Sequence, residues 1–173
     1  MKRSDIKRLP AHYDTYINKV EDLDLVAALV KYGKPVLEAE RDSLAALGDH
    51  VYAPGKWTAR DVLQHIIDVE RIFAYRALRY ARKDATPLPA FNENAYAVTA
   101  QANTRPLDDL LEEFYAVRAG TVALFKSFDE EMLQQEGQLW SGPISVLALG
   151  FATVGHAIHH MEIFRGRYYP KVK

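Results

Sequence analysis

The chain has 173 residues, with 22 lysines and arginines against 23 aspartates and glutamates, and it contains no cysteine. The nearly balanced charge offers no broad basic surface, so no nucleic-acid partner is expected. The missing cysteines exclude disulfides, thiolate metal ligands and a cysteine nucleophile. Because the N-terminus also has no apolar stretch typical of an export signal, the sequence favours a cytoplasmic protein.

Length and apolar content predict one domain over residues 1–173. With 49% apolar residues, a chain of this length can bury a sizeable core. The longest apolar run, residues 143–155, is too short to span a bilayer, so no membrane partner is expected. Apolar residues recur at helical spacing and no convincing alternating strand pattern is present, which predicts an all-α fold.

The predicted elements begin with an irregular N-terminal arm, residues 1–22. A first helix is expected over residues 23–47, with a kink or break at Gly33-Lys34-Pro35, because proline interrupts helical hydrogen bonding. A loop follows at residues 52–56.

The second helix is predicted to start at a capping box made by Thr58 and Asp61 and to continue to about Arg82. In a capping box the threonine hydroxyl and the acid satisfy backbone amides that have no helical partner. The connection over residues 84–104 is long enough to cross the domain and to carry a short helix of its own. A long crossing loop of this kind is a common place for substrate contacts.

A third helix is predicted to open at Pro106, where a proline is followed by two acids in the first turn. A fourth begins near Ser145 and runs to about Tyr168, before Pro170. Four long amphipathic helices around a shared core predict a four-helix bundle, with the long crossover between helices two and three.

Three histidines fall on the buried faces of two of these helices. His156 and His160 are four positions apart, a spacing at which both side chains can reach one divalent cation. At 100° per residue, His65 lies in the apolar stripe of the second helix and the pair lies in that of the fourth. The residues that define these stripes are Val62, Ile66, Val69, Ile72 and Phe73 around His65, and Leu149, Ala152, Thr153, Ile163 and Phe164 around the pair. Three inward imidazoles with one open position would make a catalytic kind of metal site.

A hydrogen-bonded core histidine is the alternative interpretation of each residue. The pair favours ligation more than His65 alone does, because two buried imidazoles without a metal would each need a partner in a small core. Ala157 follows His156, so the glutamate of the His-Glu-x-x-His protease helix is missing. All-nitrogen ligation suits zinc, nickel, copper or iron, of which zinc or nickel is the preferred expectation.

Several strings in the sequence resemble the DinB superfamily. They are Tyr52-Ala53-Pro54-Gly55-Lys56-Trp57-Thr58, Leu63-Gln64-His65-Ile66-Ile67-Asp68-Val69-Glu70-Arg71, Phe73-Ala74-Tyr75-Arg76, Leu88-Pro89-Ala90-Phe91-Asn92 and Gly155-His156-Ala157-Ile158-His159-His160. The resemblance covers nearly the whole chain and implies a four-helix bundle of DinB/YfiT type. It also implies that His65, His156 and His160 bind a divalent metal ion. Dimerisation is common in the family, so a homodimer is an expectation as well.

Characterised relatives in that family include thiol transferases and a thiol-dependent isomerase that use bacillithiol, mycothiol or glutathione. The resemblance therefore implies a metal-dependent S-transferase or isomerase acting on a small-molecule substrate with a low-molecular-weight thiol as partner. Met161 and Glu162 stand where relatives often have a glycine and a glutamine, which weakens any transfer of substrate identity. Two alternatives stay open: a hydrolase that uses metal-bound hydroxide, and a non-catalytic metal-binding stress-response module.

Other polar residues near the predicted site have open roles, and no catalytic residue is assigned from the sequence. Asp61 and Asp68 flank His65 and could orient its second nitrogen, although capping is the expected role of Asp61. Arg76 and Arg167 fall near the histidine faces and could meet an anionic substrate, although such arginines more often complement the helix dipole. His159 lies at the border of its face and could support the site or point elsewhere.

Overall fold

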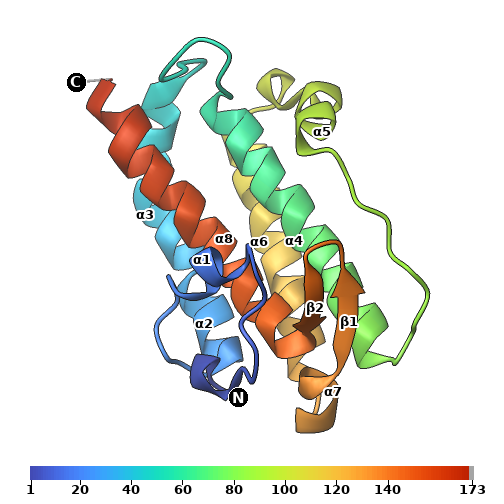
Figure 1. The fold of residues 1–173 in the computed structure, drawn as a ribbon. Helices are drawn as coiled ribbons and strands as arrows, with labels where there is room; N and C mark the ends of the chain where they lie inside the picture. The colour runs from blue at the N-terminus through green and yellow to red at the C-terminus, as the bar shows by residue number, and fades with distance from the viewer. Residues whose placement is uncertain (172–173) are drawn as a thin grey trace.

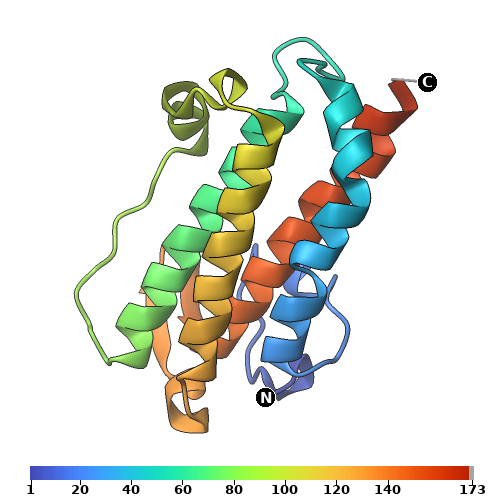
Figure 2. The same cartoon turned by 180° about the vertical axis from the view of Figure 1, so that it is seen from behind.

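Four long helical segments lie side by side in the computed structural model, which describes residues 1–171 (Figure 1). They are the pair α2 (Leu25–Lys31) and α3 (Lys34–Leu47), then α4 (Ala59–Ala81), α6 (Leu107–Lys126) and α8 (Val146–Ile163). Figures 1 and 2 show α4 and α6 running in one direction and α3 and α8 in the other. Two neighbours that run the same way need a connection as long as the helix itself, so the predicted bundle with a long crossover is confirmed.

The remaining elements are short and lie in the arm, the crossover, the connection before α8 and the segment after α8. They are η1 (Arg3–Asp5), α1 (Asp14–Ile17), α5 (Glu93–Ala100), η2 (Ala102–Thr104), α7 (Glu130–Gln134), β1 (Glu136–Leu139), β2 (Gly142–Ser145), η3 (Phe164–Tyr168) and η4 (Tyr169–Lys171). Within residues 1–171 we find no helix both long and apolar enough to cross a membrane.

The predicted break in the first helix is real and lies at Gly33, between α2 and α3. A buried arginine of α6 occupies this break: Arg118 donates to the carbonyls of Leu29 and Tyr32 at 3.1 Å each. It also binds both carboxylate oxygens of Glu70 on α4, at 2.7 and 2.8 Å. One side chain thus satisfies backbone carbonyls that the broken helix leaves free and ties three segments of the bundle together.

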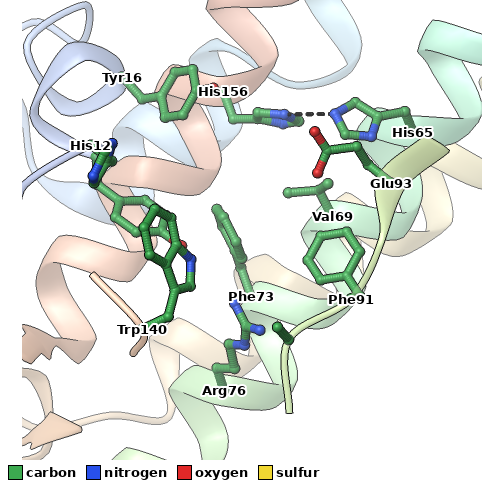
Figure 3. A pocket seen from close by; sticks show the side chains of 12 residues that line it. His12, Tyr16, His65, Val69, Phe73, Arg76, Phe91, Glu93, Trp140 and His156 are labelled. Carbon is green, nitrogen blue, oxygen red and sulfur yellow. Dashed lines mark hydrogen bonds between the residues drawn. The ribbon is translucent and has the colours of Figure 1, made fainter. Parts of the chain in front are cut away.

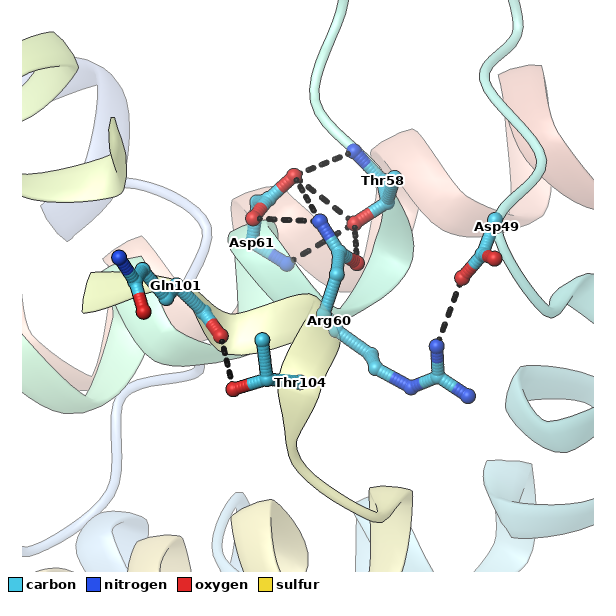
Figure 4. Close-up of polar contacts among 7 residues, drawn as sticks. Asp49, Thr58, Arg60, Asp61, Gln101 and Thr104 are labelled. Atoms are coloured by element: carbon cyan, nitrogen blue, oxygen red, sulfur yellow. Dashed lines mark hydrogen bonds and ion pairs between the residues drawn. The ribbon is translucent and has the colours of Figure 1, made fainter. Parts of the chain in front are cut away.

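The start of α4 is fixed by the predicted capping box, which also holds the end of the crossover (Figure 4). The backbone N–H of Asp61 donates to the hydroxyl of Thr58, and the Asp61 carboxylate accepts from the Thr58 backbone at 3.0 Å. Asn103, just after α5, donates its amide to the same carboxylate at 3.1 Å and accepts from the Thr58 hydroxyl at 2.7 Å. These bonds anchor the crossover beside the first turns of α4.

A β-hairpin between α7 and α8 was not predicted and corrects the expectation that strands are absent. Strands β1 and β2 pair antiparallel, with Leu139 opposite Gly142. The hairpin packs on α4, where the Tyr80 hydroxyl donates to the carbonyl of Gln138 at 2.9 Å. Its strands contain two glycines and a proline, residues that are depleted in strands. Because of this composition, the sequence shows no alternating apolar and polar pattern that would have predicted the hairpin.

Helix α8 is buried around nearly its whole circumference, because the arm packs on the face that α4 leaves uncovered. This packing depends on Gly155, where a Cβ atom would lie 2.0 Å from the carbonyl oxygen of Tyr16. The N-terminal arm, predicted as irregular, contains the short helix α1 next to this contact. The absence of a side chain at Gly155 therefore allows the arm to lie against α8, beside His156.

Candidate metal centre

Three imidazole rings from two helices meet inside the bundle. His65 comes from the second turn of α4, and His156 and His160 come from successive turns of α8. The Nε2 atom of His156 lies 3.1 Å from the Nε2 atom of His65 and 3.1 Å from that of His160. Potential ligand atoms of all three residues lie within 4.8 Å of one another. The sequence prediction that these residues converge is thus confirmed.

Hydrogen bonding alone does not explain this arrangement. One imidazole nitrogen carries either a single lone pair or a single N–H in the ring plane, so it makes one good hydrogen bond. Two other imidazole nitrogens nevertheless approach Nε2 of His156 to the same distance. In addition, the Nδ1 atom of His160 is buried and has no hydrogen-bond partner. The interpretation as hydrogen-bonded core histidines therefore leaves at least two ring nitrogens unsatisfied.

The three residues do fit a divalent cation. Zinc–nitrogen bonds of 2.0–2.1 Å in a tetrahedral site separate two ligand nitrogens by about 3.3 Å. The two His156 separations, 3.1 Å each, are close to that value. Three nitrogen donors from the protein leave one position of a tetrahedral site open, which is the arrangement of catalytic zinc sites. These three histidines could hold a metal ion.

Burial keeps these rings neutral at physiological pH. Loss of hydration lowers the pKa of His65 to about 4 and, helped by neighbouring histidines, that of His160 to about 3. The pKa of His156, which is 5% exposed, is lowered well below its ordinary value by the same cause. Only a neutral imidazole has a lone pair to offer a metal, so the triad can bind a cation at neutral pH without losing protons.

A cleft of about 310 Å³ reaches the imidazoles of His65 and His156 (Figure 3). Phe73 of α4 and Phe91 of the crossover lie along it, and Trp140 at the turn of the hairpin stands at its rim with His12 of the arm. The N-terminal arm, the crossover and the hairpin thus each contribute a wall of the cleft. The cleft lies at the lower end of the size range of small-molecule sites.

Glu93, the first residue of α5, is the polar residue that the sequence reasoning missed. Figure 3 shows its carboxylate pointing toward the gap between His65 and His156. Its charge also raises the pKa of Tyr16, after the larger effect of burial. The length of the crossover was the available signal: it indicated substrate contacts in this segment without indicating which residue makes them.

The two acids next to His65 do not orient it. Asp61 serves the capping box, as expected, and Asp68 accepts a hydrogen bond from Gln64 at 3.0 Å. Burial raises the pKa of Asp68, and the hydrogen bond from Gln64 and the nearby charge of Arg71 act against this. The outer-sphere role considered for these acids is therefore not supported by the contacts of the described residues.

The two arginines considered in the sequence analysis lie in different places relative to the cleft. Arg76 lines the cleft, whereas Arg167 is exposed, donates to the Tyr52 hydroxyl at 3.3 Å and stays outside it. His159 stacks edge-on against Tyr16, with ring centroids 5.3 Å apart, and lies outside the triad.

Comparisons with known proteins agree with this fold. A sequence model of the DinB superfamily matches residues 38–164. A solved structure described as "YfiT from Bacillus subtilis is a probable metal-dependent hydrolase with an unusual four-helix bundle topology" matches with a TM-score of 0.65. The match covers 88% of this chain and 86% of that chain at 19% identity, so it speaks to the fold alone. No curated protein sequence matches the chain.

The lowered pKa values predict that the metal-free protein loses stability in mild acid. Below the ordinary histidine pKa of 6.5, the unfolded chain binds protons that folded His65 and His160 do not accept until about pH 4 and about pH 3. The free energy of unfolding should therefore fall as the pH drops from 6.5 toward 4, by up to about 1.4 kcal/mol per pH unit for each histidine.

Urea unfolding of the metal-free protein at a series of pH values measures this slope. His160→Asn should reduce the slope of the unfolding free energy against pH by the contribution of one histidine. This reduction is expected whatever the variant does to stability at pH 7.5. A slope identical in the wild type and the variant would contradict the burial effect.

Proposed function

The chain belongs to the DinB superfamily, and from this membership and the converging imidazoles we propose that it is a metal-dependent hydrolase of small organic substrates. His65, His156 and His160 hold one divalent ion, for which zinc or nickel is the best fit to three nitrogen donors. The observation that carries the proposal is the meeting of three neutral nitrogens at the end of a cleft that a carboxylate also lines. The description of the similar fold as a probable metal-dependent hydrolase supports the same reaction class.

The ion would supply Lewis acidity and lower the pKa of water at the open position toward about 7. The protein supplies the proton transfers. A carboxylate oxygen of Glu93 accepts the proton of the water that attacks the acyl carbon, and it returns this proton to the leaving oxygen or nitrogen as that bond breaks. Glu93 thus takes the role of the glutamate that is missing after His156. Phe73 and Phe91 keep bulk water away from the substrate.

Transfer of a low-molecular-weight thiol is the second candidate, and a second hollow favours it. This hollow, of about 240 Å³, reaches His160 from the side of Tyr52 and Trp57, away from the cleft at His65 and His156. A transferase needs space for both a thiol and an electrophile near one metal, and a thiolate is a good ligand for the open position. Hydrolysis ranks first because Glu93 offers a proton acceptor in the cleft.

The first prediction of this proposal concerns metal content. Protein purified without a metal column and equilibrated with zinc should carry one ion per chain by elemental analysis. His65→Ala, His156→Ala and His160→Ala should each weaken binding on the order of 100-fold, since each removes about a third of the protein's ligands. His159→Ala, on the same helix but outside the triad, is the matched control and should keep the ion. Retention of the ion by any of the three variants would rule out that residue as a ligand.

Turnover tests the reaction class. Zinc-loaded protein should hydrolyse p-nitrophenyl esters of short acids without any added thiol, lose this activity with a chelator, and regain it when zinc is restored. Parallel reactions contain an alkylating electrophile with glutathione, bacillithiol or mycothiol. Conjugation of a thiol without ester hydrolysis would favour the thiol transferase over the hydrolase. A metal-loaded protein that is inactive in all of these reactions would favour the non-catalytic metal-binding module.

Glu93→Gln should lower kcat for ester hydrolysis about 100-fold or more, because it removes the proton acceptor and keeps the shape. Metal content should not change. Glu112→Gln changes an exposed glutamate of α6 that does not line the cleft and should leave kcat as it is. Equal kcat values for Glu93→Gln and the wild type would refute the role assigned to Glu93.

A further inference from the structure

Arg76 is a buried cation in the cleft that no carboxylate neutralises. It is 5% exposed, and within residues 1–171 no acid lies within ion-pair distance of its guanidinium. One of its nitrogens, Nη2, donates to the carbonyl of Pro89 in the crossover at 3.1 Å. The hydroxyl of Tyr13, which also lines the cleft, lies within hydrogen-bonding reach of Arg76 as well. A guanidinium has five N–H donors in a flat fork, so donors remain for a ligand.

The other buried arginine of this chain shows what complete pairing looks like here. Arg118, 3% exposed, makes two hydrogen bonds to the carboxylate of Glu70 and two to backbone carbonyls. Burying a charge is costly unless it is paired and hydrogen-bonded, and Arg118 meets this condition. Arg76 has an equally buried position and lacks the acid. It also faces a cavity, as Figure 3 shows, whereas Arg118 is enclosed in the core.

The residues between Arg76 and the imidazoles are apolar and aromatic. Along α4, His65, Val69, Phe73 and Arg76 succeed one another at intervals of three and four positions, so they share one face that lines the cleft. The ring of Phe73 lies 6.3 Å from that of His156, and the guanidinium carbon of Arg76 lies 5.8 Å from the ring of Phe91. The cleft therefore has the imidazoles of His65 and His156 at one end, a cation at the other, and aromatic walls between them.

We propose that Arg76 binds a carboxylate of the substrate, and that the substrates are elongated carboxylic acids with an aryl or alkyl body. The bond to be hydrolysed lies at the opposite end, beside the three histidines. The placement of this bond rests on the proposed function, whereas carboxylate binding at Arg76 does not. A planar fork of N–H donors matches the two oxygens of a carboxylate, and the low polarity of the surrounding aromatic walls strengthens such a pair.

The charges of the cleft fix the direction in which such a molecule lies. Among residues 1–171, Arg76 is the only lysine or arginine that lines it, and Glu93 lies next to the imidazoles. A carboxylate is attracted to the first end and repelled from the second. The Cα atoms of His65 and Arg76 are about 16 Å apart along α4, and the arginine side chain leans back toward the start of the helix. The separation suits a substrate with a body of several carbon atoms.

Calorimetric titration of the metal-free protein at pH 7.5 tests the proposal without relying on catalysis. The probes are 4-phenylbutyrate and its neutral isostere 4-phenylbutyramide. The acid should bind the wild type roughly 10- to 100-fold more tightly than the amide, as expected for hydrogen bonds to a charged group. Arg76→Met should abolish this preference, and Arg76→Lys, which keeps the charge without the fork, should retain part of it. Arg82→Met, at an exposed arginine directly after α4 and outside the cleft, should bind as the wild type does.

Equal affinity of the wild type for the acid and the amide would overturn the proposal, whatever the variants do. Thermal unfolding checks that Arg76→Met is folded; its melting temperature should match or exceed that of the wild type, because it removes an unpaired buried charge. Kinetics supply the second readout: mono-p-nitrophenyl glutarate should have a KM at least 10-fold below that of its methyl ester, and Arg76→Met should erase the difference with little change in kcat. If no ester is hydrolysed, but the wild type still binds the acid more tightly than the amide and Arg76→Met does not, the proposed reaction is wrong and the carboxylate site is supported.

Discussion

The convergence of three imidazole nitrogens between α4 and α8 is the constraint on which the rest of this structure depends. Burial makes protonation of these rings unfavourable, as their lowered pKa values show. It also leaves the Nδ1 atom of His160 without a partner. A core would gain stability by replacing such groups with apolar ones, so their presence calls for a ligand. A divalent ion accepts the lone pairs that the rings cannot satisfy among themselves.

The bundle positions this site, and the segments outside the bundle give it a cleft. Because α4 and α6 run in the same direction, the chain must return along the outside of the bundle (Figure 1). This return places Glu93, the first residue of α5, beside the imidazoles of His65 and His156 (Figure 3). The capping box of α4 holds the far end of the crossover through Asn103. Gly155 admits the N-terminal arm, and Tyr80 holds the hairpin that carries Trp140. Substrate recognition can therefore change in these segments without disturbing the metal ligands.

The sequence predicted the features that follow from periodicity and local capping. The four helices, the break at Gly33, the start of α4 at Thr58 and the inward direction of three histidines all depend on residues close together in the chain. The walls of the cleft depend on distant segments, and periodicity carries no information about these. Glu93 is exposed at a helix start and reads as an ordinary first-turn acid. The hairpin carrying Trp140 is too short, and too rich in glycine, for a strand signal. Dimerisation and location stay predictions.

X-ray absorption spectroscopy of the zinc-loaded protein tests the central claim most directly, because it counts and measures the atoms bound to the ion. The account predicts three imidazole nitrogens and one exchangeable light atom, all at about 2.0–2.1 Å. Addition of a small thiol should replace the light atom by sulfur at about 2.3 Å if the open position is accessible. A spectrum with fewer than three imidazoles, or with a closed sphere of four protein ligands, would contradict it.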